Sequence, residues 1–116
     1  MSLKKRLRIT VYEKLNGEDI FWKKLSITPK YPLVCDKFEE CKEFIVEDND
    51  IMPKGFCTWA WDDLVRMITY LQYNGDFPFY EEKGAALASC TDGVRPVIFK
   101  LENLMINKNR ERPNRA

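Results

Sequence analysis

The stretch "WAWDDLVRMITYLQY", residues 59 to 73, decides the fold because it holds the best helix in the chain. Apolar side chains recur on one side at helical spacing, and charged and amide side chains fall largely on the other. The core side carries Trp61, Leu64, Val65, Ile68 and Leu71, and the opposite side carries Asp62, Asp63, Arg66 and Gln72. The stretch predicts one amphipathic helix, whose apolar side needs a second layer to pack against.

The residues around this helix predict where it begins and ends. The hydroxyl of Thr58 can cap the first turn, and the acidic pair that follows suits the positive end of the helix dipole. Gly75 can adopt the left-handed conformation that stops many helices.

Alternating apolar and polar residues predict the second layer as strands. Residues 6–14 alternate, residues 44–46 form a short apolar run, residues 85–91 are small, and residues 97–102 alternate most clearly. We therefore expect an α+β fold, with one principal amphipathic helix packed on a small antiparallel sheet.

Two connections between these elements carry specific expectations. Between the last two strands, a four-residue turn from Thr91 to Val94 would leave Pro96 on a sheet edge, where proline's missing N–H costs nothing. Residues 16–36 read as connecting structure with a turn at Asn16-Gly17. We expect Trp22, Tyr31 and other large residues there to fold back as a lid over the core.

Length and composition indicate one globular domain. The chain has 116 residues, of which 45% are hydrophobic and 32% charged, enough to build one core and too few for two domains of ordinary size. We expect a single α+β domain over residues 1–106 and a flexible basic tail over residues 107–116. The tail has no aromatic residues, and the body between the basic ends is acidic although the whole chain is near neutral at +1, so a nucleic-acid partner is not expected.

Membrane and metal sites are also disfavoured. No apolar run approaches the roughly 20 residues that span a bilayer, and no secretion signal is evident, so we expect a cytoplasmic protein. The chain has four cysteines and no histidine, which removes histidine-based triads and histidine metal sites. No close C-x-x-C pair occurs, and no cofactor is predicted.

The segment "GFCTWAWDD", residues 55–63, crowds Cys57 and two tryptophans against the start of the predicted helix. Unpaired backbone N–H groups there favour an anion, so Cys57 is the best candidate for an acidic thiol. Alternatively, it is a small buried hydrophobic residue beside the tryptophans. Trp61 belongs to the core stripe, whereas Trp59 is free to line a pocket.

A second segment, "CTDGVRPV" at residues 90–97, gathers a thiol, a hydroxyl, a carboxylate and a guanidinium. Such a loop could hold an anionic or polar ligand through Arg95 and backbone N–H groups. It could instead be a stapled turn, in which Asp92 bonds nearby backbone and pairs with Arg95.

Together, "KGFCTWAWDDL" and "SCTDGVRPVIFKLE" resemble a family of small prokaryotic proteins marked by an F-C-x-W-A-W segment and a C-T-D-G-x-R-P-V segment. The resemblance covers residues 8–102 and implies no activity. Cys41 stands where relatives have glycine, which disfavours a four-cysteine site. The implied motif positions are Cys35, Cys57, Trp59, Trp61, Cys90, Asp92, Gly93, Arg95 and Pro96.

Three functional hypotheses follow from these residues. The first is a domain that binds an unknown small ligand in a pocket formed by Cys57, Trp59, Cys90, Asp92 and Arg95. The second is thiol chemistry, either redox exchange between Cys57 and Cys90 or a thiolate metal centre that adds Cys35. The third is an interaction module, such as a homo-oligomer, with exposed aromatic anchors. The proposed anchors are Phe77, Phe79 and Tyr80.

Overall fold

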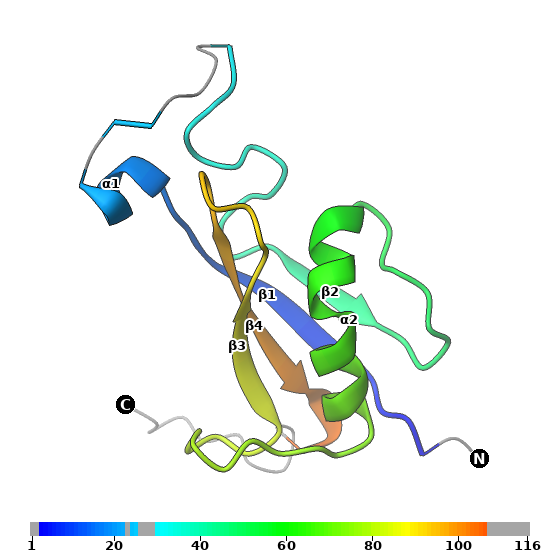
Figure 1. The fold of residues 1–116 in the computed structure, drawn as a ribbon. Helices are drawn as coiled ribbons and strands as arrows, with labels where there is room; N and C mark the ends of the chain where they lie inside the picture. The colour runs from blue at the N-terminus through cyan, green and yellow to red at the C-terminus, as the bar shows by residue number, and fades with distance from the viewer. Residues whose placement is uncertain (1–2, 23, 26–29, 107–116) are drawn as a thin grey trace.

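Four strands form one antiparallel sheet in the order β2-β1-β4-β3, and the long helix α2 lies across it (Figure 1). The computed structural model describes residues 3–22, 24–25 and 30–106, so the predicted tail lies outside the described residues. The expected α+β fold is confirmed. The elements are β1 (Leu7–Lys14), α1 (Gly17–Phe21), β2 (Glu43–Val46), α2 (Thr58–Gln72), β3 (Ala85–Ser89) and β4 (Val97–Asn103).

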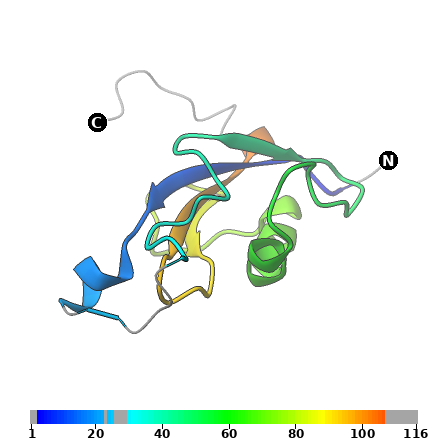
Figure 2. The same cartoon turned by 90° about the horizontal axis from the view of Figure 1, so that it is seen from above.

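The core lies between α2 and one face of the sheet, and Figure 2, which views α2 end-on, shows the helix on that side of the sheet. Leu7, Ile9 and Val11 of β1 are fully buried there, and Phe99 of β4 is as well. Burial alternates along the first five residues of β1 and of β4 because one face of the sheet is covered by α2, as the sequence pattern predicted. A bulge between Val11 and Glu13 interrupts the pairing of β1 with β4.

The buried side of α2 differs from the predicted one at two positions. Leu64, Ile68 and Leu71 are buried as expected, but Val65 is 37% exposed and Gln72 only 2%. Burial of Gln72 is compatible with its polar end because its Nε2 donates a hydrogen bond to the Glu47 carbonyl at 3.0 Å. Within the described residues, no helix is long and apolar enough to cross a bilayer.

Both ends of α2 are shifted by one residue from the prediction. Cys57, not Thr58, is the N-cap, and its carbonyl accepts the first helical bond from Trp61 N at 2.8 Å. At the other end Asn74 takes the left-handed conformation, with φ 67°, instead of Gly75. Asparagine tolerates that conformation because its short polar side chain bonds locally.

The segment after β1 contains α1, a helix that the sequence pattern did not predict. Asn16 is its N-cap, and its side chain accepts a hydrogen bond from Glu18 N at 2.8 Å. The lid prediction was wrong for Trp22, which is 91% exposed beyond the end of α1. Phe38 holds the following segment to the core, with its ring centroid 5.2 Å from that of Phe99.

The β3–β4 connection is longer than the predicted four-residue turn. Ser89 pairs with Ile98, and Cys90 N donates to Val97 O at 3.1 Å, so the loop spans residues 91–96. Pro96 is not on a sheet edge, because β4 lies between β1 and β3. It precedes the first residue of β4, a position where a proline needs no N–H.

Candidate functional site

Three segments far apart in the sequence meet where α2 begins and enclose a cavity of about 520 Å³. They are residues 30–38, the start of α2 and the β3–β4 connection, which lie at one end of the sheet (Figure 1). We call this cavity the site pocket. All five candidate residues line it, namely Cys57, Trp59, Cys90, Asp92 and Arg95.

A hydrogen-bond chain fixes the indole ring of Trp59 at the edge of the site pocket. Its Nε1 donates to Thr91 Oγ1 at 2.9 Å. Asp63 holds Thr91 in turn, since its carboxylate accepts from Thr91 N at 2.8 Å and lies 3.1 Å from the Thr91 hydroxyl. The ring therefore stays in one orientation although 67% of Trp59 is exposed.

Asp92 and Arg95 form the stapled turn that the sequence allowed as an alternative. Asp92 Oδ1 accepts from Val94 N at 3.0 Å, and Oδ2 accepts from Arg95 Nε at 2.9 Å. Partial burial acts to raise the pKa of Asp92. The hydrogen bonds from the Arg95 side chain and from two backbone N–H groups outweigh burial, so the pKa lies below the ordinary carboxyl value.

Arg95 also ties the loop to the opposite wall of the site pocket. Its Nη1 donates to the Pro32 carbonyl at 3.2 Å. The hydrogen bond to Asp92 raises the pKa of Arg95 against an opposing effect of burial, and the negative charges of Asp92 and Asp36 raise it further. The guanidinium therefore lies in the field of the two carboxylates that line the pocket.

Three of the four cysteines line the site pocket, and all four are free thiols. Cys90 Sγ accepts from Val97 N at 3.4 Å, and Cys35 Sγ accepts from Lys37 N at 3.4 Å. Cys41 is exposed and does not line the pocket. Among the described residues, no three cysteine or carboxylate side chains are grouped so that they could hold a metal ion.

The floor of the pocket is apolar and its rim is aromatic and charged. Phe38, Ala60 and Val97 are each at most 5% exposed and form the floor. Tyr31 and Lys37 belong to the rim. The sequence analysis expected Tyr31 to fold back as a lid, and it lies at this pocket half exposed. Lys37 and Phe38 were missed, because no periodic pattern indicated which side chains of residues 30–38 turn inward.

The predicted aromatic anchors form a cluster away from the site pocket, after α2. The ring centroids of Phe77 and Phe79 lie 5.8 Å apart, and those of Phe79 and Tyr80 lie 4.7 Å apart. Phe77 and Tyr80 pack against the core, whereas Phe79 is 76% exposed. Only Phe79 therefore presents most of its surface to a partner.

Comparison of the chain with protein-family models, curated proteins and solved structures gives no match. The resemblance to the small prokaryotic family therefore stays a prediction. The structure places the two tryptophans of the motif in different surroundings. Trp61 packs on the core beside Phe56, with ring centroids 6.3 Å apart, whereas Trp59 lines the site pocket.

Proposed function

We propose that this chain is a small-ligand-binding domain and that the ligand occupies the site pocket. The observation that carries this proposal is the convergence of Cys57, Trp59, Cys90, Asp92 and Arg95 on one cavity of about 520 Å³. Cavities of roughly 300–1,000 Å³ with apolar walls and a few polar groups are typical of small-molecule sites.

The pocket favours a flat ligand with an apolar body. The fixed indole of Trp59 offers a rigid surface for stacking, and rigid aromatic walls lose little entropy when a ligand binds. Phe38 and Val97 supply apolar contact at the floor, together with the pocket sulfurs. The walls are held by the Thr91 and Arg95 hydrogen bonds, so the cavity exists before the ligand arrives.

Protein-observed NMR with indole as the probe tests this function. We expect saturable shifts of the Trp59 indole N–H signal and of backbone signals from residues 90–97. The Trp22 indole is an internal control, because its exposed ring does not line the site pocket. Shifts of equal size at Trp22, or no saturation, would contradict specific binding.

Matched leucine variants test whether the ligand enters the cavity. Cys57→Leu fills part of the site pocket and should weaken indole binding by at least tenfold. Cys41→Leu makes the same change outside the pocket and should leave binding unchanged. Equal effects of the two variants would argue against this site.

Thiol redox exchange is the second candidate, supported by the presence of Cys35, Cys57 and Cys90 around one cavity. In that reaction two pocket thiols would lose two electrons and two protons to glutathione disulfide, forming one protein disulfide and two glutathiones. Intact-mass measurement after such treatment tests it. A product only of the exposed Cys41 with glutathione would rule it out.

A further inference from the structure

The charged side chains that line the site pocket do not all have a partner of opposite charge among the described residues. The lining residues include three cations, Lys30, Lys37 and Arg95, and two carboxylates, Asp36 and Asp92. Asp92 is paired with Arg95 at 2.9 Å, and the charge of Asp36 also acts on the Arg95 guanidinium. Arg95 can offset the charge of only one carboxylate, so the lining as a whole has one positive charge in excess, and the two lysines are the cations that could supply it.

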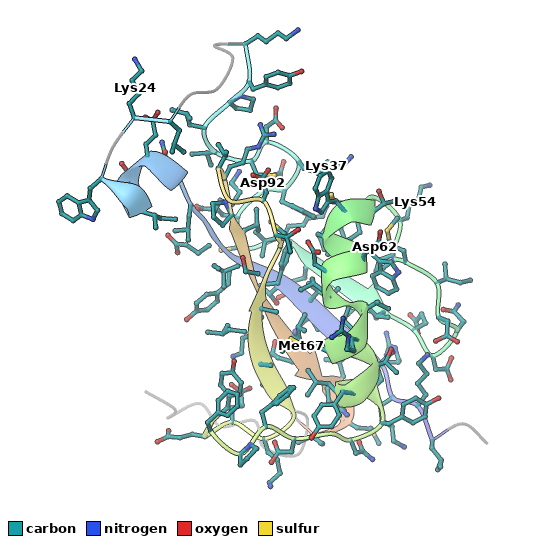
Figure 3. The ribbon with its side chains drawn as sticks, viewed as in Figure 1. Lys24, Lys37, Lys54, Asp62, Met67 and Asp92 are labelled. Atoms are coloured by element: carbon teal, nitrogen blue, oxygen red, sulfur yellow. The ribbon has the colours of Figure 1, made fainter. Side chains whose placement is uncertain are left out.

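The two lysines differ in what surrounds their ammonium groups. Lys30 Nζ lies 5.5 Å from the ring centroid of its neighbour Tyr31 and makes a cation–π contact there. The Lys37 ammonium has no ion pair, hydrogen bond or ring contact with any residue that the structure describes. In Figure 3 the labelled Lys37 and Asp92 lie at the same end of the molecule, near the start of α2.

The apolar floor opposes this charged rim. Phe38 and Val97 are almost fully buried at the floor, and Trp59 stands at the edge with its ring fixed by Thr91. A ligand that fits both regions needs an apolar ring at one end and one negative charge at the other. A second negative charge would meet Asp36 and Asp92, so one charge suits the pocket better than two.

We propose that the site pocket selects flat aromatic monoanions, with the ring against Trp59 and the carboxylate or similar group at Lys37. This inference rests on the proposed function and adds the chemical class of the ligand. It assigns Lys37 as the residue that recognises the charge, whereas Arg95 positions the loop and the opposite wall.

The experiment compares the affinity of the protein for 2-naphthoate with its affinity for the uncharged 2-naphthamide. Binding is measured from the same NMR signals, those of the Trp59 indole N–H and of residues 90–97. These probes share a ring system and differ in charge. An exposed ion pair contributes modestly, so we expect 2-naphthoate to bind about threefold more tightly in low salt. Added salt should reduce that preference, because exposed charges are screened.

Two matched variants locate the charge recognition. Lys37→Gln keeps most of the side-chain length and should abolish the preference for the anion. Lys54→Gln removes the same charge from a neighbouring surface, where Lys54 lines a separate groove beside β2, and should retain the preference. Figure 3 shows Lys54 at the same end of the molecule as Lys37.

The outcomes distinguish the two proposals. Equal binding of both probes, or an unchanged preference in Lys37→Gln, overturns the anion inference and leaves the ligand-binding function standing. Tighter binding of 2-naphthamide also overturns it. Absence of saturable shifts with both probes and with indole overturns the proposed function itself.

Discussion

The indole Nε1 of Trp59 donates a hydrogen bond to Thr91 Oγ1 over 2.9 Å, although 32 positions separate the two residues in the chain. This bond joins the first turn of α2 to the β3–β4 connection. Because Asp63 also accepts from Thr91, a single threonine links the helix, the loop and the aromatic wall of the site pocket.

Thr91→Val should therefore loosen the site pocket while keeping the side-chain shape. We expect a loss of about 1 kcal/mol of unfolding free energy, typical of removed hydrogen bonds, and a shifted Trp59 indole N–H signal. Urea unfolding and NMR measure the two effects. Thr69→Val is the control, because its hydroxyl only bonds the Val65 carbonyl one turn back in the same helix; a Trp59 shift there would undermine the assignment.

Alanine variants of Gly17, the first residue of α1, and of Gly93, in the β3–β4 connection, test the contact between α1 and that connection. Gly17 N donates to Val94 O at 2.6 Å, and a Cβ on Gly17 would collide with the Val94 carbonyl. Backbone cannot rotate away as a side chain can, so Gly17→Ala should cost about 1–3 kcal/mol of unfolding free energy. Gly93→Ala meets no atom within 4 Å and should change stability by under about 0.5 kcal/mol. Similar costs in both variants would mean that the close approach of α1 to the loop is incorrect.

Alkylation by iodoacetamide reports which thiols share the pocket. Cys41 is exposed and should react fastest, while the half-buried Cys35, Cys57 and Cys90 should react more slowly. Saturating indole should slow only the three pocket cysteines, because the ligand covers their sulfurs. Peptide mass mapping at several times gives the four rates. Protection of Cys41 to the same degree would indicate a global effect of indole instead of pocket occupancy.

The Asp92–Arg95 pair predicts a defined pH dependence of stability. The pKa of Asp92 lies below its ordinary value of 3.8, so the ionised form is favoured in the folded state. Its contribution is complete above about pH 4 to 5 and is lost as the pH falls through the folded-state pKa. Both side chains are about one-third exposed, so we expect a coupling of only about 0.2–1 kcal/mol at pH 7. A double-mutant cycle with Asp92→Asn and Arg95→Gln, measured from pH 7 to pH 2.5, should show this coupling vanish in acid; a coupling that grows in acid would reverse the assigned pKa direction.

The sequence predicted α2, β1 and β4 most clearly because each has a periodic pattern that covers many residues. The burial of Leu64, Ile68 and Leu71 followed from helical spacing, and that of Leu7 and Ile9 followed from alternation. Two side chains show the limit of the pattern. Gln72 is buried where the pattern predicted exposure, and Val65 is partly exposed where it predicted burial. Gln72 has a specific partner, the Glu47 carbonyl, and such partners do not appear in a local sequence window.

The candidate site was predictable in part for a similar reason. The two motifs indicated which residues could share a pocket, and the structure places all five on one cavity. The third wall was not predictable, since Lys37 and Phe38 lie in a segment without regular structure. Asn16 with Glu18 and Asp19 was the one local signal for α1, because asparagine caps helices and acidic residues suit the first turn. The pair Asn16-Gly17 by itself predicts only a turn.

The outer edge of the sheet at β3 yields the last prediction, which concerns self-association. Gly84 O and Cys90 N form hydrogen bonds with β4 residues. Backbone groups of successive residues point to opposite sides of a strand, so the N–H and C=O of Leu87, an odd number of positions from both, point away from β4. The Tyr80 hydroxyl occupies both of these groups: Leu87 N donates to it at 3.2 Å, and it donates to Leu87 O at 3.3 Å. An unprotected edge strand is a template for pairing with another chain, and this hydroxyl covers the middle of β3.

Tyr80→Phe removes that cover while keeping the ring contacts with Phe79, so it should increase self-association of the chain. Sedimentation velocity over a hundredfold range of concentration measures the effect, and we expect a higher average mass for Tyr80→Phe than for the unmodified chain at the top of the range. Tyr70→Phe is the matched control, because the Tyr70 hydroxyl donates to Asp76 O at 2.7 Å and not to β3.

If a homo-oligomer instead forms through the exposed ring of Phe79, Phe79→Ser should lower the average mass and Tyr80→Phe should leave it unchanged. The two variants thus distinguish pairing at the strand edge from docking through the aromatic cluster.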